Sequence, residues 1–382
     1  MAKTRSKTES KQKEKLTESR KLDHIRICLE REVESSIPTG FDDITLIHNA
    51  VPELNLEDVD IQTSFLGHKL QAPIMITAMT GGHQEALPIN KHIAQAVEKL
   101  GLAMGVGSQR AAIEDISLAD SFTITREVAP TAFLVGNIGA PQLSLGWGVD
   151  EVQKAIDMIK ANAVAIHFNA TQEAVQPEGE ANFAGVLQSI KTLSAEISTP
   201  VIAKETGAGL SQSTATVLMA AGVKALDVAG LGGTSWPAVE VERAKPGDVL
   251  KATLGRWFTN WGIPTAVATF EVAYAVKKRV PIIASGGIRT GIDVAKAIAI
   301  GANLVGVALP ALSPAILDAK AVQLYLESLI QGLKAAMFLV GAANLKELSQ
   351  APLVISGRTR EWLEYRVYED LVEFKADRRI RK

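Results

Sequence analysis

The sequence has one cysteine, few aromatic residues and no long apolar run. Aromatic residues make up 5% of its 382 residues, and Cys28 is the only cysteine, so an internal disulfide framework is excluded. We interpret Cys28 as a small buried apolar residue in a protein of a reducing compartment. Because no apolar stretch approaches the roughly 20 residues that a bilayer-spanning helix needs, no membrane span is expected.

Neither sign of charge dominates the chain. It has 40 Lys and Arg against 42 Asp and Glu, a net charge of −2. The whole molecule therefore has no field that would attract nucleic acid or a membrane. An anionic ligand must instead be held by a local group of residues. With 47% apolar and 21% charged residues, the composition is that of a globular protein and excludes global disorder.

The amino-terminal segment is basic and poor in apolar residues. The first 21 residues contain eight Lys or Arg and three Glu, and Leu16 is the only large aliphatic residue among them. This composition predicts a flexible basic arm over residues 1–19. It does not fit an apolar signal segment, and its glutamates argue against a transit peptide. We therefore expect a cytoplasmic protein.

From residue 72 onward, short apolar runs alternate with segments of helical periodicity. Eight runs are expected to be strands, beginning near Ala72, Ala103, Ala132, Ala163, Pro200, Ala225, Pro281 and Asn303. Helical patterns between them include residues 152–159, 183–197, 267–276 and 294–300. Nearly continuous apolar runs are typical of parallel strands covered by helices on both faces.

This order of elements predicts an α/β protein with a (β/α)8 TIM barrel over residues 72–341. A doubly wound open sheet is the alternative, because a count of strands does not show that the sheet closes. The flanking segments are interpreted as an N-terminal helical extension over residues 20–71 and a C-terminal helical segment over residues 342–382.

Polar and glycine residues follow the predicted strands, where the active sites of this fold lie. Glycines after a strand let backbone N–H groups converge on an anion without a Cβ in the way. The turn from Gly286 to Arg289 follows the seventh predicted strand and leads into a helix near Gly291. Because the helix N-terminus adds its dipole, this turn predicts a phosphate site.

Lys204 ends the fifth predicted strand, where a buried ammonium needs an anionic partner. Glu205 points to the other face of the strand and is not its natural pair. Three roles remain open for Lys204. It could balance an electron-rich ring or a phosphate, act as a Schiff-base nucleophile, or pair with a carboxylate of another strand.

The fourth predicted strand ends in a second polar group. His167 and Asn169 share one face of the strand, and Gln172 and Glu173 follow in the loop. These groups suit a ligand with many acceptor atoms, together with a divalent cation. Mg²⁺ takes one or two carboxylates plus substrate phosphate oxygens, which makes Glu173 the candidate ligand, with a solvated loop glutamate as the alternative.

Together these motifs resemble the type 2 isopentenyl-diphosphate isomerase family. The matching segments, in order, are MTGGH, GVGSQR, GNIGAPQ, HFNATQE, KETGAGLS, AGLGGTSW, SGGIRTG and GVALP, within a region from about Arg20 to about Arg366. The resemblance implies an FMN-dependent TIM-barrel enzyme of isoprenoid biosynthesis that interconverts isopentenyl and dimethylallyl diphosphate. It also implies Mg²⁺, reduced FMN with NADPH or NADH as reductant, and a homo-oligomer that is a tetramer or larger.

The resemblance also assigns roles to individual residues. The implied FMN-binding residues are Ala78, Met79, Thr80, Ser108, Asn137, Lys204, Thr234, Gly286, Gly287, Arg289, Ala308 and Leu309. The implied substrate-binding residues are Arg20, Lys21, His24, Ser108, Gln109, Arg110, His167, Asn169 and Gln172. Glu173 would bind Mg²⁺, Lys204 would face the anionic reduced flavin, and Gln172 would lie at the reacting end of the substrate.

The chemistry that the resemblance implies adds a proton at C4 of the substrate and removes one from C2. An unactivated alkene is a poor base, so the acid must be strong and the developing cation needs electron density nearby. An anionic reduced flavin meets both needs. Since an amide is a poor acid, we interpret Gln172 as a positioning group and the flavin as the principal acid and base.

Two other functions compete with this one. An FMN-dependent 2-hydroxy-acid oxidase or dehydrogenase uses the same barrel but needs a rim histidine, and none of the six histidines follows Ala225. A structural oligomer has no reason to collect His167, Gln172 and Lys204 at one rim. The segment after the sixth predicted strand, with Trp236, Trp257 and Trp261, is interpreted as either a lid or a subunit contact.

Overall fold

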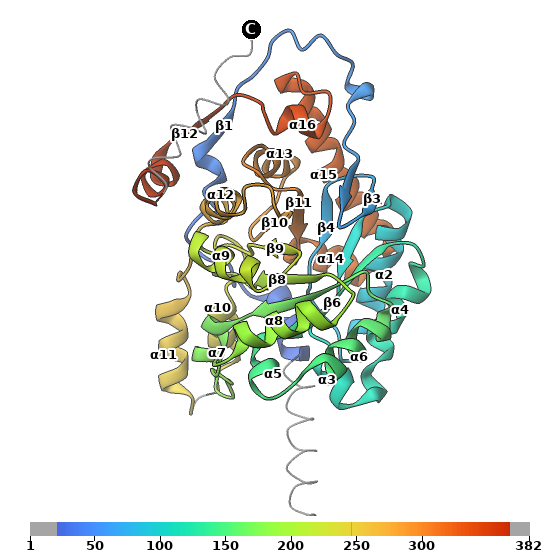
Figure 1. Cartoon of the computed structure of the whole chain (residues 1–382), viewed down its shortest axis with the longest axis vertical. Helices are drawn as coiled ribbons and strands as arrows, with labels where there is room; N and C mark the ends of the chain where they lie inside the picture. Colours follow the sequence, from blue (N-terminus) through green and yellow to red (C-terminus); the bar gives the residue numbers. More distant parts are fainter. Residues whose placement is uncertain (1–20, 246, 367–382) are drawn as a thin grey trace, which may run out of the picture.

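The computed structural model describes residues 21–245 and 247–366, and its centre is a closed barrel of eight parallel strands (Figure 1). The strands are β4 (Ile74–Ile76), β5 (Ala103–Gly105), β6 (Phe133–Gly139), β7 (Ala163–Phe168), β8 (Val201–Glu205), β9 (Ala225–Asp227), β10 (Ile282–Ser285) and β11 (Leu304–Val307). Pairing of β11 with β4 closes the sheet. The predicted (β/α)8 barrel is therefore confirmed, and the open sheet is excluded.

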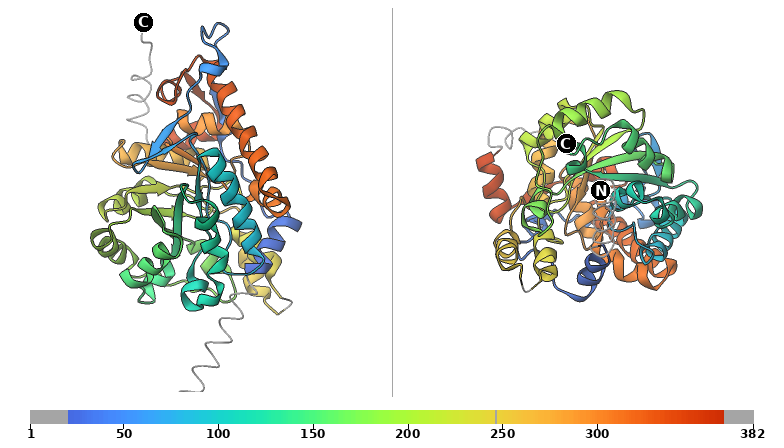
Figure 2. Two further views of the ribbon diagram at one scale, coloured as in Figure 1. Left: turned by 90° about the vertical axis from the view of Figure 1, so that its right-hand side faces the viewer. Right: turned by 90° about the horizontal axis from the view of Figure 1, so that it is seen from below.

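Helices surround the barrel (Figure 2). The covering helices are α2 (Ala86–Leu100), α4 (Asp120–Val128), α6 (Val149–Ile159), α8 (Val186–Glu196), α9 (Gln212–Ala220), α12 (Thr265–Val276), α13 (Gly291–Ala299) and α15 (Ala319–Val340). Further helices follow the strands or connect these elements: α3 (Arg110–Glu114), η3 (Ile116–Leu118), α5 (Ala140–Ser144), α7 (Ala170–Val175), α10 (Trp236–Arg243), α11 (Val249–Phe258) and α14 (Leu309–Leu317). All four helical patterns expected from the sequence lie in or overlap helices of the ring.

The barrel interior is packed at its amino-terminal end. Buried side chains of the strands fill it, among them Met75, Phe133, Ile202 and Leu304. A hairpin of β2 (Thr63–Phe65) and β3 (His68–Leu70) adds Phe65 and Leu70 to this cluster, and the Phe65 and Phe133 rings meet edge to face at 5.6 Å. Apolar side chains close this end of the described barrel, and the carboxyl ends of the strands are the end that is open to a ligand.

The two flanking segments meet outside the barrel. Residues 21–30 are helical, and η1 (Phe41–Asp43), β1 (Ile44–Leu46) and η2 (Leu56–Asp58) follow. The C-terminal segment contains α16 (Leu345–Leu348), β12 (Leu353–Ile355) and a helix over residues 357–366. Antiparallel pairing of β1 with β12 joins the segments (Figure 1). Each segment thus carries strand structure that the helical interpretation omitted.

Some sequence predictions fall on residues that the structure does not describe. The basic arm of residues 1–19 and the candidate ligand Arg20 lie outside the described residues. Within the described part of the chain, no helix has the length and apolar character needed to cross a membrane.

Candidate active site

A cavity of about 250 Å³ opens at the carboxyl ends of the barrel strands. Loops after all eight strands contribute to its wall, together with the helix over residues 21–30. Nearly all described residues that the sequence singled out line it: Lys21, His24, Ala78, Met79, Thr80, Ser108, Arg110, Asn137, His167, Asn169, Gln172, Glu173, Lys204, Thr234, Gly286, Gly287, Arg289, Ala308 and Leu309. The barrel therefore brings together groups that are up to 288 positions apart in the chain, from Lys21 to Leu309.

Gln109 is the exception, and its proposed contact with substrate needs correction. Its side chain is fully buried and does not line the cavity. The amide Nε2 donates to the carbonyl of Ala155 at 2.8 Å, and Oε1 accepts from the N–H of Asn137 at 2.8 Å. Both ends of the side chain are used in joining β6 to α6, so none is left for a ligand.

Glycines shape the turn after β10. Gly286 and Gly287 have φ angles of 103° and 70°, which favour glycine. A Cβ on Gly286 would lie 2.2 Å from the carbonyl oxygen of Gly230, and one on Gly233 would lie 2.5 Å from the N–H nitrogen of Gly287. The loops after β9 and β10 can approach this closely only without side chains. The result is a backbone cradle beside the N-terminus of α13, where an anion is favoured.

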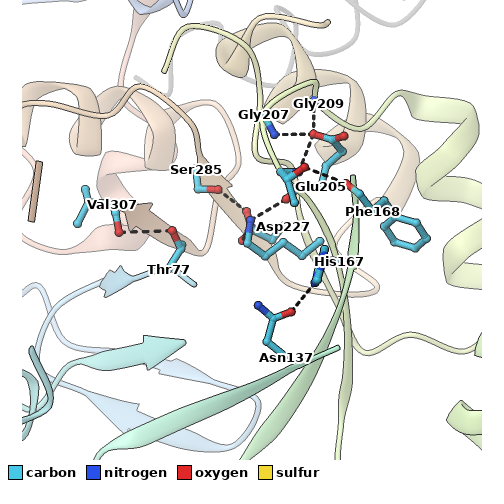
Figure 3. A network of polar contacts seen from close by, with 12 residues as sticks. Thr77, Asn137, His167, Phe168, Glu205, Gly207, Gly209, Asp227, Ser285 and Val307 are labelled. Carbon is cyan, nitrogen blue, oxygen red and sulfur yellow. Dashed lines mark hydrogen bonds and ion pairs between the residues drawn. The ribbon is translucent and has the colours of Figure 1, made fainter. Parts of the chain in front are cut away.

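His167 is held as a neutral imidazole. Asn137 donates from Nδ2 to the carbonyl of Val106 at 3.1 Å, which turns its Oδ1 toward His167 Nδ1 at 2.8 Å (Figure 3). Nδ1 therefore carries the proton and donates it. Burial, with the nearby charges of Lys204 and Lys21, lowers the pKa of His167 to about 3. At neutral pH its Nε2 is an acceptor.

Lys204 has a carboxylate partner within the barrel. Its Nζ donates to the carbonyl of Glu205 at 2.6 Å and lies 3.6 Å from Oδ2 of Asp227 on β9. Ser285 of β10 donates from Oγ to the other oxygen of Asp227 at 2.5 Å (Figure 3). Pairing with another strand's carboxylate, one of the three roles left open for Lys204, is therefore present in the structure.

Glu205 organises the loop that follows β8. Its Oε2 accepts from the N–H groups of residues 206–209 at 2.7, 2.6, 2.5 and 3.1 Å. Figure 3 shows the contacts with Gly207 and Gly209. The side chain is directed into this loop, away from the ammonium of Lys204, as the alternation along a strand predicts. Burial raises the pKa of Glu205, and the N–H groups partly offset that rise.

Glu173 lies in a cluster of amides at the start of α7. Its Oε1 accepts from Asn169 Nδ2 at 2.7 Å, and its Oε2 accepts from Gln176 Nε2 at 2.7 Å and from the N–H of Glu180 at 2.6 Å. No group of three or more His, Cys, Asp or Glu suited to a metal occurs in the described ranges. A cation here would therefore need oxygens from a ligand besides the single carboxylate.

The sequence analysis missed Glu240, which is 2% exposed on α10. Its Oε1 lies 3.0 Å from His24 Nε2 and accepts from Gln172 Nε2 at 2.8 Å. Burial alone would raise the pKa of Glu240, but His24, Arg243 and Gln172 together hold it below its usual range. Trp236 lines the cavity, and Glu240 follows it by four positions on α10, so both lie near one face of the helix. That spacing was the only available signal for Glu240.

Cations line the mouth of the cavity. Lys21 Nζ donates to the carbonyls of Gly81 at 2.5 Å and Ser108 at 2.9 Å. Arg110 pairs with Glu114 at 2.9 Å and with Glu180 at 2.8 Å, and Arg289 pairs with Glu34 of the N-terminal extension. The extension therefore supplies part of the charged wall.

Two other features of the wall follow from burial. Cys28 packs partly buried beside the cavity, and burial raises the pKa of its thiol to about 12, so the thiol stays protonated. The three tryptophans after β9 have different surroundings. Trp236 faces the cavity, and its ring centroid lies 5.1 Å from that of His24. Trp257 and Trp261 are 73% and 62% exposed. Only Trp236 covers the site.

Curated relatives match the chain over almost its whole length. An isopentenyl-diphosphate delta-isomerase of Metallosphaera sedula is 48% identical over 92% of this chain and 98% of its own. Proteins of the same name from Thermococcus onnurineus and Archaeoglobus fulgidus are 48% and 49% identical, covering 96% and 92% of this chain and 99% of each relative.

This chain belongs to the isopentenyl-diphosphate delta-isomerase family. The resemblance inferred from its motifs is thereby confirmed. A model of the FMN-dependent dehydrogenase family also matches residues 145–355, which include β7 to β11 and the glycine cradle.

Solved structures resemble this isomerase-family chain in fold alone. A mandelate oxidase structure has a TM-score of 0.61 at 19% identity, covering 87% of this chain and 96% of its own. A flavocytochrome b2 structure has a TM-score of 0.60 at 17% identity, covering 84% of this chain and 77% of its own. At such low identity these likenesses establish the barrel architecture and carry no argument about the reaction.

Proposed function

We propose that this protein interconverts isopentenyl and dimethylallyl diphosphate in isoprenoid biosynthesis, using reduced FMN and Mg²⁺. The observation that carries the proposal is the family membership, at about 48% identity over 92% of the chain. The cavity supports it, because an anion cradle, a buried lysine and a polar reacting region all lie on one barrel rim.

The residues present fit FMN. The cradle of Gly233, Gly286 and Gly287, with Arg289 at its edge, would hold the phosphate, since the loops after β9 and β10 come this close together only because these glycines have no Cβ. The first three strand ends would contact the ring system through Ala78 to Thr80, Ser108 and Asn137. Thr234, Ala308 and Leu309 would complete the wall. Lys204 would balance the negative charge of the reduced ring, which supplies electron density and an acid–base group when it is bound.

The substrate diphosphate would lie among Lys21, His24, Arg110 and the polar end of β7. Lys21 and Arg110 already donate to carbonyls or carboxylates, so the diphosphate would compete for hydrogen bonds that exist. Arg20, Ser108, His167 and Asn169 complete the proposed set. Because His167 presents a neutral acceptor, it can contact the anion favourably only after taking up a proton at Nε2.

Glu173 is the proposed Mg²⁺ ligand. Its carboxylate lines the cavity and accepts from the amide of Asn169 at the carboxyl end of β7. Substrate phosphate oxygens and waters would supply the other positions of the octahedron. The amides that now contact Glu173 would orient its oxygens toward the ion.

Gln172 and Glu240 would position the reacting end of the substrate. Gln172 donates to a carboxylate that also contacts His24, so the three side chains share one network. That network fixes the amide of Gln172 and leaves its oxygen directed at Asn169, at 3.3 Å. The remote diphosphate contacts hold the reacting carbons in place, which lowers the entropic part of the barrier.

The quaternary structure and the reductant belong to the same proposal. NADPH or NADH would keep the flavin reduced. The exposed Trp257 and Trp261, with Val249 and Leu250 on α11, form an apolar surface that we assign to contact with a second copy in a tetramer or larger assembly. Light scattering at increasing protein concentration tests this assembly.

The decisive experiment is turnover of isopentenyl diphosphate with FMN, Mg²⁺ and a reductant, omitting each in turn. We expect yellow protein and activity only with all three. Activity with oxidised FMN under strict exclusion of reductant would overturn the reduced-flavin proposal. A 2-hydroxy-acid oxidase is not proposed, because the loop from Ala229 to Trp236 after β9 contains no histidine; the assay would detect it as oxidation of a 2-hydroxy acid.

A further inference from the structure

Asp227 is a buried carboxylate that the proposed reaction does not use directly. It is 1% exposed at the end of β9, and the register of the parallel ladder sets it opposite Lys204 of β8. It does not line the large cavity. Instead it lines, with Lys204, a void of about 10 Å³ inside the barrel. Two residues that line the large cavity, Lys204 and Ser285, contact Asp227 directly, and Lys204 is the charged one.

The two oxygens of Asp227 have separate partners. Oδ1 accepts from Ser285 at 2.5 Å, and Oδ2 lies 3.6 Å from Lys204 Nζ. The charged and titratable groups that face Lys204 are Asp227 on β9, His167 on β7 and the carboxylate of Glu205 on its own strand. His167 is neutral, and Glu205 is directed into its loop, so Asp227 supplies the closest negative charge.

An ammonium taken out of water loses hydration that one backbone carbonyl does not replace. In the oxidised enzyme the flavin ring has no negative charge to balance it. Asp227 is then the group that makes the charged form of Lys204 favourable. In the reduced enzyme the bound ring would add a second negative charge near the ammonium.

We propose that Asp227 is a positioning residue that keeps Lys204 charged and directed at the flavin while the flavin is oxidised. The inference rests on the proposed FMN site. It gives Asp227 one consequence that a merely structural carboxylate would not have: it sets how many protons accompany reduction of the flavin.

The proton count follows from charge balance. With Lys204 already charged, the oxidised flavin takes two electrons from the reductant and one proton from solvent, and becomes an anion. Without Asp227, Lys204 is neutral beside the oxidised flavin and takes up a second proton when the anion forms. For two electrons, one proton gives a midpoint potential that falls by about 30 mV per pH unit, and two protons give about 59 mV per pH unit.

The test is a reductive titration of the FMN-loaded protein against reference dyes from pH 6 to pH 9. The parent should show the shallower slope and Asp227→Asn the steeper one. Asp227→Glu keeps the charge and should restore the shallower slope. Equal slopes in the parent and Asp227→Asn would overturn the proposal.

A stability cycle covers the case in which Asp227→Asn fails to fold, and it needs no FMN. Lys204→Met leaves an unpaired buried carboxylate, whereas Lys204→Met with Asp227→Asn removes both charges. The double variant should therefore melt at a higher temperature than Lys204→Met alone. A double variant no more stable than Lys204→Met would show that the charges are not coupled. If the parent takes up no FMN, the proposed function fails, and this cycle still decides the pairing.

Discussion

At the scale of single residues, the site depends on carboxylates whose charge matters more than their shape. Glu173 accepts three hydrogen bonds and is the proposed metal ligand. Glu173→Gln keeps the shape and removes the charge, so we expect lower activity and a higher Mg²⁺ requirement. FMN affinity should stay near that of the parent, because the proposed flavin contacts are elsewhere. Activity against Mg²⁺ concentration and a flavin titration measure both effects; loss of FMN would instead assign Glu173 a structural role.

His167 makes stability depend on pH. Its folded-state pKa is lowered from 6.5 to about 3. Its contribution to the free energy of unfolding is therefore fully present above pH 6.5 and is lost as the pH falls toward 3. Between pH 7.5 and 5.5 the unfolded chain gains a proton that the native chain does not, which costs about 1.4 kcal/mol. The advantage of the parent over His167→Gln in urea unfolding should shrink by that amount. His48→Gln, at an exposed position outside the cavity, is the control substitution.

At the scale of elements, one buried carboxylate on α12 binds the C-terminal helix over residues 357–366 through hydrogen bonds and an ion pair. Glu271 is fully buried and accepts from Trp362 Nε1 at 3.1 Å, Arg366 Nε at 3.0 Å and the N–H of Gln212 at 2.9 Å. Glu271→Gln removes the charge and replaces one acceptor oxygen by an NH2 group. That group then faces N–H donors and cannot accept from them. We expect the free energy of unfolding to fall by about 1–3 kcal/mol.

The matched control for this substitution lies on the C-terminal helix itself. Glu364 pairs with Arg360 at 2.6 Å on the exposed side, so Glu364→Gln should change the free energy of unfolding by less than about 0.5 kcal/mol. Urea unfolding of both variants gives the comparison. Equal effects would mean that Glu271 does not fasten the helix.

At the scale of the whole molecule, the N-terminal extension completes a site that the barrel builds. The helix over residues 21–30 contributes Lys21, His24 and Cys28 to the cavity wall. Replacing both Arg20 and Lys21 by Ala should raise the substrate KM at least tenfold, roughly 1.4 kcal/mol. FMN binding should hardly change. Deletion of residues 1–15 is the control and should have little effect, because salt screens diffuse charge. An unaltered KM in the double variant would remove the extension from the active site.

Local patterns in the chain were enough to predict the barrel, its rim and the family. The alternation of apolar runs and helical periods predicted each of the eight strands, because parallel strands buried on both faces need apolar side chains throughout. Glycines after β10 and polar residues at the strand ends identified the ligand-binding rim of the barrel. They could do so because tight turns need glycine and ligand contacts need polar side chains at those positions. Motifs in order and spacing identified the family.

The partners of these residues became known from the folded barrel alone. The pairing of Lys204 with Asp227, the contact of Glu240 with Gln172 and the pairing of β1 with β12 join segments that are distant in the chain. The same holds for Gln109, which the motif assigned to the ligand and the fold uses to join β6 to α6. Local sequence patterns report which way a side chain points along its own strand or helix. They do not report what the neighbouring element places opposite it, because register and packing between elements settle only when the barrel closes.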